Sequence, residues 1–173
     1  MAPHASAFPK MKTTVPPTAS LDYADAPSDA AVDLHVLLAY ENLAAALRAT
    51  EMLATLSRKD PDGLAVQLSP WSFAALENSD WRAQAVPYAA RAHLIVIAAC
   101  GAVPRLSAAI EDWLQTCLAQ PREDHLAVAA LFHRHDRPDG GDSPRLRSVQ
   151  RLAHEAGCAF FAPGVTGELA CLV

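Results

Sequence analysis

Short apolar runs alternate with longer Ala/Leu-rich segments from residue 31 onward. Five runs have the length and composition of β-strands: 32–39, 64–68, 93–99, 126–132 and 158–162. The runs at 93–99 and 126–132 are apolar throughout instead of alternating with polar residues. Strands of that kind are covered on both faces and are typical of parallel sheets flanked by helices.

The segments between these runs predict helices. Residues 41–58 and 144–156 have helical composition, and Gly157 is a suitable C-cap. Residues 72–91 predict a helix in two pieces, with Ser79-Asp80 as the cap of the second. Pro104 is expected to begin a further helix, whose apolar face recurs at 106, 110, 113, 114 and 117.

Strand–helix alternation of this kind builds βαβ units with right-handed crossovers. The sequence therefore predicts an α/β fold, a three-layer α/β/α sandwich with about five parallel strands in the order 2-1-3-4-5. Leu169–Val173 is expected to add a short edge strand. Residues 1–30 contain five prolines and show no sustained period, which predicts a flexible arm ahead of a single α/β domain at 31–173.

The composition narrows the classes of partner. The 173 residues carry 14 Lys+Arg against 19 Asp+Glu, a net charge of −5, which argues against nucleic acid or an anionic membrane as a partner. No apolar run reaches the ~18–20 residues of a membrane span, and the first residues lack the apolar core of a signal peptide. We therefore expect a soluble, cytoplasmic protein.

Cysteine and lysine usage excludes several chemistries. The four cysteines, at 100, 117, 158 and 171, form no CxxC pair, so no zinc ribbon or thioredoxin-like site is expected. Lysine occurs only at 10, 12 and 59. A GxxxxGK[ST] phosphate loop is therefore absent, and a Schiff-base lysine late in the chain is impossible.

A site is expected at the carboxyl edge of the sheet, because ligands of open parallel sheets bind where the strand order reverses. The loops there supply eight candidate ligand-binding residues: Tyr40, Glu41, Asn42, Trp71, Cys100, Arg105, His133 and His135. Each also has an ordinary structural role open to it. Glu41 and Asn42 suit a helix start, Tyr40 and Trp71 suit packing, and Arg105 suits solvent.

Two of these candidates suggest specific chemistry. His133 and His135 with Asp136 have metal-ligand character, but no further His or Cys pair completes a site, so no metal is predicted. Cys100 precedes a predicted helix N-terminus, a position that favours a thiolate, and a buried inert cysteine is the alternative. No GxSxG or GxGxxG motif occurs.

The alternation resembles that of response-regulator receiver domains and flavodoxins. The receiver resemblance implies an acidic pair after the first strand, an Asp ending the third and a Lys ending the fifth. Here Glu41 alone stands near the first position, and the third and fifth strands end in Ala99-Cys100-Gly101 and Ala162-Pro163-Gly164. The flavodoxin resemblance implies a Ser/Thr/Gly-rich phosphate loop after the first strand, whereas Tyr40-Glu41-Asn42-Leu43 stands there. The resemblance thus concerns shape, and no cofactor is predicted.

Two functions from different classes remain open. The first is a non-catalytic module that self-associates, as a homodimer, or binds a protein partner or small effector; the apolar Leu169–Val173 segment motivates it. The alternative is a small enzyme or binder that acts on a nucleotide-like or anionic metabolite at the carboxyl edge of the sheet.

Overall fold

The computed structural model describes residues 33–59, 64–100, 105–121, 125–132 and 143–162. The predicted arm at 1–30, the pair His133 and His135, and the Leu169–Val173 segment lie outside these ranges. The structure therefore tests none of the three predictions made for them.

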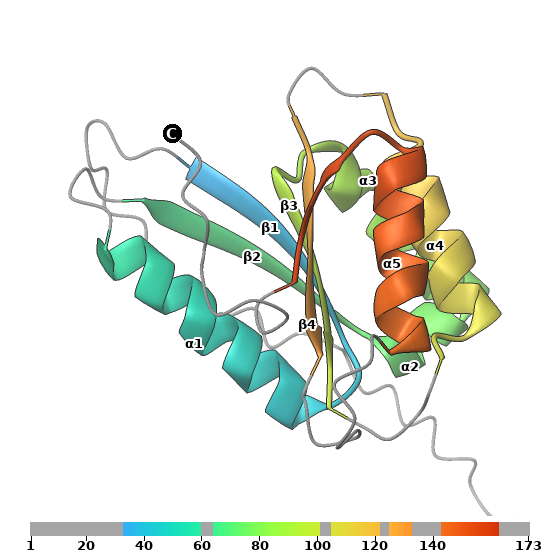
Figure 1. Ribbon diagram of the computed structural model, residues 1–173, viewed down its shortest axis with the longest axis horizontal. Coiled ribbons are helices and arrows are strands. Elements are labelled where there is room, and N and C mark those ends of the chain that lie inside the picture. Colours follow the sequence, from blue (N-terminus) through green and yellow to red (C-terminus); the bar gives the residue numbers. More distant parts are fainter. Residues whose placement is uncertain (1–32, 60–63, 101–104, 122–124, 133–142, 163–173) are drawn as a thin grey trace, which may run out of the picture.

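Five parallel strands form one sheet in the order β2-β1-β3-β4-β5 (Figure 1). The strands are β1 (Asp33–Tyr40), β2 (Ala65–Ser72), β3 (Leu94–Ala99), β4 (Ala127–Phe132) and β5 (Ala159–Phe161). Both the parallel sheet and the flavodoxin-like order 2-1-3-4-5 predicted from the sequence are confirmed.

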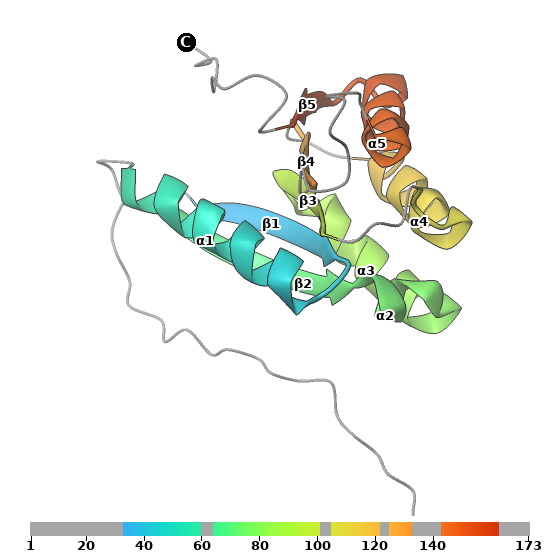
Figure 2. The ribbon, with the colours of Figure 1, turned by 60° about the horizontal axis from the view of Figure 1, so that its bottom comes forward.

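Helices cover both faces of the sheet, but unequally (Figure 2). The helices are α1 (Leu43–Lys59), α2 (Phe73–Glu77), α3 (Ser79–Ala90), α4 (Ala108–Leu118) and α5 (Pro144–Glu155). Among the helices of the described residues, α1 alone packs on one face, where Ala45, Ala49 and Leu53 meet Val36, Leu38 and Val96. The other four helices pack on the opposite face around Leu37, Ile97 and the fully buried Trp113. The fold is thus the predicted three-layer sandwich.

Most element boundaries differ from the sequence predictions by one or two residues, and three differences have a clear physical basis. β2 continues through Ser69 and Pro70 to Ser72 instead of ending at residue 68. β2 is an edge strand of the sheet. Proline is tolerated there because its missing N–H is not needed for pairing with a second neighbouring strand. The cap of α3 is Asn78, whose Oδ1 accepts hydrogen bonds from Asp80 N and Trp81 N, and not Ser79. α4 begins at Ala108 behind the Ser107 cap, four residues after the predicted start.

Two further findings bear on the sequence expectations. No helix within the described ranges is long and apolar enough to cross a bilayer. The C-cap of α5 is Ala156, and Gly157 follows it with φ = 69°, the left-handed conformation in which a glycine commonly ends a helix.

Candidate functional site

The strand order reverses between β1 and β3, whose carboxyl ends lie side by side. Tyr40 of β1 pairs with Ala98 of β3, so Glu41 and Cys100 leave neighbouring strands at the same edge. The backbone N–H of Glu41 donates to Ala98 O over 2.9 Å, which extends the pairing by one residue. This edge is where the sequence placed the candidate site.

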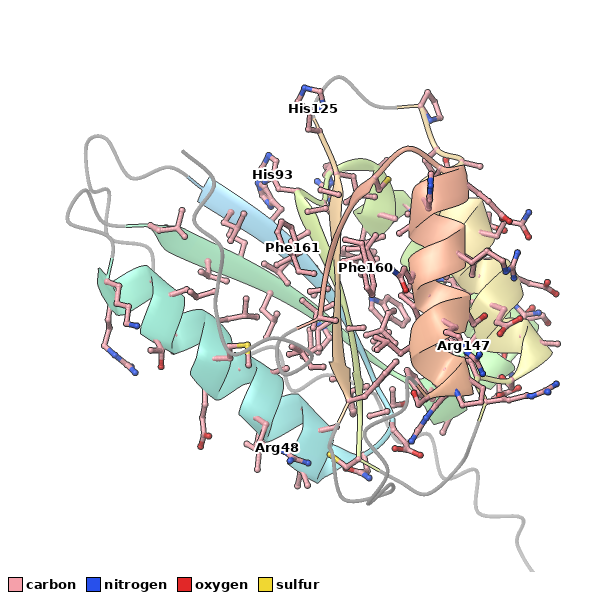
Figure 3. The ribbon with its side chains drawn as sticks, in the orientation of Figure 1. Arg48, His93, His125, Arg147, Phe160 and Phe161 are labelled. Carbon is pink, nitrogen blue, oxygen red and sulfur yellow. The ribbon has the colours of Figure 1, made fainter. Side chains whose placement is uncertain are left out.

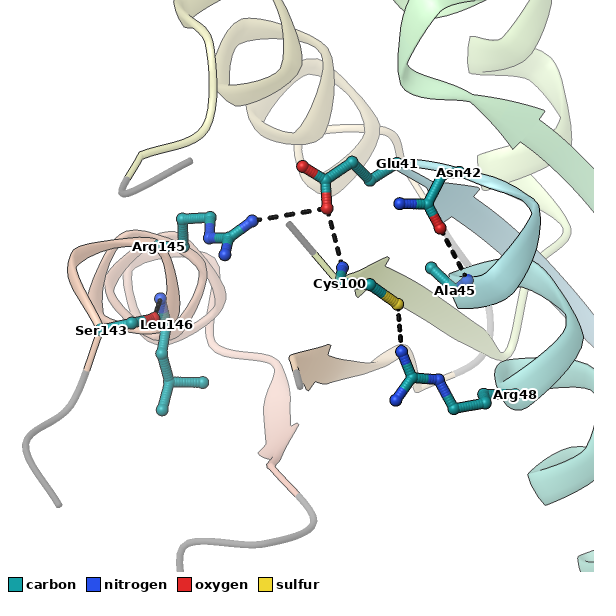
Figure 4. A network of polar contacts seen from close by, with 8 residues as sticks. All are labelled: Glu41, Asn42, Ala45, Arg48, Cys100, Ser143, Arg145 and Leu146. Atoms are coloured by element: carbon teal, nitrogen blue, oxygen red, sulfur yellow. Dashed lines mark hydrogen bonds and ion pairs between the residues drawn. The ribbon is translucent and has the colours of Figure 1, made fainter. Parts of the chain in front are cut away.

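Glu41 is the centre of a polar network at this edge (Figure 4). Its Oε2 accepts a hydrogen bond from Cys100 N over 2.7 Å and lies 3.7 Å from Nη1 of Arg145. The side chains of Glu41 and Arg145 are 19% and 6% exposed, so the ion pair is largely removed from water. An ion pair in that environment is costly to break, because its partner would remain as a buried charge.

Arg145 is held in place by the start of α5. Ser143 Oγ accepts from Leu146 N over 3.1 Å, and Pro144 occupies the first helical turn. The guanidinium lies 5.4 Å from the ring centre of Phe132, at the end of β4. A cation at a helix N-terminus opposes the helix dipole, and here Glu41 and the aromatic ring offset that penalty.

The start of α1 supplies the remaining members of the network. Asn42 Oδ1 accepts from Ala45 N over 3.0 Å and so caps the helix. In the second turn of α1, the guanidinium of Arg48 donates to Sγ of Cys100. Cys100 is therefore held through both its backbone and its thiol.

The arrangement favours a structural role for these residues. An anion at the carboxyl edge needs unoccupied N–H donors at a strand end or a helix start. Here Glu41 takes the N–H of Cys100 and Asn42 takes that of Ala45. Within the described part of the chain, no cluster of three or more His, Cys, Asp or Glu side chains has the geometry for a metal ion.

The structure brings together only some of the eight predicted residues. Glu41 and Cys100 are in direct contact, and Asn42 adjoins them. Tyr40 packs on the α1 face of the sheet, whereas Trp71 packs on the opposite face. There the Trp71 ring contacts Tyr88 edge to face, with ring centres 5.8 Å apart. Tyr40 and Trp71 therefore lie at the same edge but pack on opposite faces of the sheet.

Of the remaining predicted site residues, only Arg105 lies within the described part of the chain. Arg105 is exposed and precedes the Ser107 cap of α4. Sequence reasoning missed Arg48 and Arg145, the two cations of the network. Arg145 carried a usable signal: an arginine directly after the Ser143-Pro144 helix start stands where the dipole disfavours a cation, which indicates an acidic partner nearby.

Comparisons with known proteins add little to this picture. No family model and no curated protein matches the sequence. Among solved structures, the chain is similar to an azoreductase from Bacillus anthracis str. Sterne at 12% identity and a TM-score of 0.45. The match covers 75% of this chain and 85% of that one. At this level the similarity concerns the fold, and no functional argument rests on it.

Proposed function

We propose that this protein is a non-catalytic α/β module that forms a homodimer through the α1 face of its sheet. The observation that carries the proposal is a row of paired residues crossing that face: Leu38, Val96, Ala129 and Phe161. In that order, these side chains are 0%, 1%, 9% and 36% exposed, so exposure increases from β1 toward β5. The face is apolar throughout, but α1 covers only part of it.

The part that the described helices leave uncovered forms a surface that we call the open shelf: Met52 and Leu56 of α1, Leu131 of β4, and Ala159 and Phe161 of β5. Figure 3 shows Phe161 on the side of β5 facing away from α5, and Phe160 on the α5 side. Met52 and Leu56 are each 40% exposed. They continue the line of Arg48 at four-residue steps, and Arg48 reaches Cys100 at the end of β3. That line therefore starts, at Arg48, on the β3 side of α1.

A second apolar surface lies on the outer side of α1. Leu43 and Leu47, one turn apart, are 70% and 55% exposed. Ala45, Ala49 and Leu53 form the opposite, buried stripe of the same helix. Exposed leucines adjacent along a helix are a feature of interfaces, because water contact with apolar area is unfavourable.

These two surfaces complement each other in a two-fold dimer. The outer side of α1 from one copy covers the open shelf of the other, and the symmetry repeats the contact. Each helix then lies between two sheets, and each sheet gains the second helix that its α1 face lacks within the described residues. The interface is also compatible with the reducing, cytoplasmic setting expected from the sequence, because it requires no disulfide.

Sedimentation velocity across a concentration series tests the proposal. The full chain is expected to show a monomer–dimer equilibrium. Phe161→Glu and Leu47→Glu each place a charge in the interface twice per dimer. Because burying one Leu or Phe side chain contributes roughly 1.5–3 kcal/mol, the dimer Kd should rise on the order of 100-fold or more.

Ala83→Glu is the matched control, since Ala83 is exposed on α3, across the sheet from α1. It adds the same charge and should leave the Kd unchanged. A full chain that stays monomeric at all concentrations would contradict the proposal. If such a monomer dimerised only after removal of residues 163–173, the shelf would belong to that segment and not to a second copy.

The alternative function, an enzyme or binder of an anionic metabolite at the carboxyl edge, stays a prediction. The described contacts there give it no support, because the network of Glu41, Asn42 and Cys100 engages the donors that such a ligand requires.

A further inference from the structure

We propose that a pocket between β2 and the end of α3 binds a small planar monocarboxylate. The pocket has a volume of about 210 Å³ and is distinct from both the carboxyl-edge network and the open shelf. Residues of β1, β2 and α3, together with Arg91 directly after α3, line the pocket; they include His35, Leu37, Gln67, Ser69, Tyr88 and Arg91.

The register of the sheet sets the floor of this pocket. His35 pairs with Gln67 and Leu37 pairs with Ser69, and paired residues of parallel strands project to the same face. Leu37 belongs to the core beneath α2–α5, so this row faces α3. The floor therefore offers an imidazole, an amide and a hydroxyl around one fully buried leucine.

The last turn of α3 forms the wall. The Arg91 guanidinium lies 5.9 Å from the centre of the Tyr88 ring, which in turn contacts Trp71 edge to face. The aromatic pair fixes the position of Tyr88, and Tyr88 supports Arg91 beside the cavity. A cation thus stands at the mouth of a partly apolar pocket.

The polar side chains of this pocket differ from those at the carboxyl edge. Among the described residues, no hydrogen bond or ion pair engages the side chains of Gln67, Ser69 or Arg91. At the carboxyl edge, by contrast, Glu41, Arg48 and Arg145 contact one another or Cys100. Polar groups that converge on a cavity and have spare hydrogen-bonding capacity are the usual basis of a small-molecule site.

The lining specifies the chemical class of the ligand. One guanidinium matches one carboxylate, which it binds through two parallel hydrogen bonds. The ring of Tyr88, which is 43% exposed, suits a flat apolar body, while Ser69 and Gln67 can bond to a further polar group. The volume lies below the roughly 300–1,000 Å³ of pockets for drug-sized ligands, so the molecule is small.

Titration of the ¹⁵N-labelled full chain with sodium benzoate tests this proposal. The amide signals of Gln67, Ser69 and Arg91 should shift in a saturable manner. Arg91→Gln should weaken binding about tenfold or more, because a charge-assisted hydrogen bond is lost. Ser69→Ala should weaken it less, by a few-fold. Benzamide, which has the same shape without the charge, should bind at least tenfold more weakly than benzoate.

Arg105→Gln is the matched control, because it removes an exposed arginine at the carboxyl edge and should leave benzoate affinity unchanged. The side chain of Arg91 is exposed and only its backbone caps α3, so Arg91→Gln is expected to fold normally. An unchanged thermal midpoint checks this. The proposal is overturned if benzoate causes no saturable shift, or binds Arg91→Gln or benzamide equally well. It is also overturned if the shifts centre on Cys100 and Arg145, which would place the anion at the carboxyl edge.

Discussion

The two faces of the sheet are built from equally apolar strands but are covered to different extents. On the face beneath α2–α5, Leu37, Ile95 and Val128 form one row of paired residues, and each is 0% exposed. On the α1 face the neighbouring row loses its cover progressively toward Phe161. The comparison shows that an apolar strand sequence indicates which faces of the strand can be buried. It does not indicate how many helices cover each face.

Truncation in the closed face should have the largest effect on stability. Ile95→Ala removes a side chain enclosed by strands on both sides and helices above, so it leaves a cavity that cannot collapse. We expect a loss of about 3–5 kcal/mol in the free energy of unfolding, measured by urea denaturation. Met52→Ala, at the border of the open shelf, is the control and should cost about 1 kcal/mol or less. Equal losses would mean that the two faces are covered alike.

Loss of the carboxyl-edge ion pair should have the second-largest effect on stability, because the pair joins the end of β1 in the sheet to α5 in the helical layer. Glu41→Gln keeps an acceptor for Cys100 N but removes the carboxylate charge that lies 3.7 Å from the buried Arg145 guanidinium. We expect a loss of about 2–3 kcal/mol, below the full cost of a buried pair since Glu41 is partly exposed.

Glu155→Gln provides the control for that charge change. It breaks the pair with Arg151, in which both side chains are 56% exposed. An exposed pair of this kind contributes about 0.5 kcal/mol or less. If both substitutions cost the same, the Glu41–Arg145 pair is solvated in solution and does not hold the edge together.

The sequence predicted the layers and the parallel sheet, because both rest on local periodicity. The strand order, also confirmed, was predicted as a common order of such sheets and not from periodicity. It also placed Glu41 and Cys100 at one edge, since both directly follow adjacent strands. It did not predict the face on which Trp71 packs, because that face depends on where β2 ends and on the alternation of side chains along it. β2 was expected to end before Ser69, whereas the actual register sets Trp71 opposite Ala39 and so on the other face from Tyr40. Arg145 could not be placed either, because its partner Glu41 lies 104 residues earlier and only tertiary packing joins them.

Removing the N-cap of α1 should reduce the stability of the protein less than the two changes above, and its effect should be confined to the α1 face of the sheet. Asn42→Ala removes the acceptor for Ala45 N, which should cost about 1 kcal/mol. Because α1 is the only described helix on its face, the loss should raise hydrogen exchange throughout its first turns while α4 stays protected. Asn78→Ala removes the equivalent cap from α3, which packs among other helices, and should show a more local increase. A uniform increase over the whole sheet in both variants would contradict this contrast.

The smallest effect on the monomer is expected at the outer side of α1. Leu47→Gln replaces a side chain that is 55% exposed with a residue of similar helix propensity. At concentrations well below the dimer Kd, the free energy of unfolding should change by about 0.5 kcal/mol or less. At high concentration the native chain gains stability from association and the variant does not, so their thermal midpoints should separate as protein is added. A constant difference at every concentration would show that Leu47 contributes only within its own chain, and that the open shelf is not covered by the α1 of a second copy.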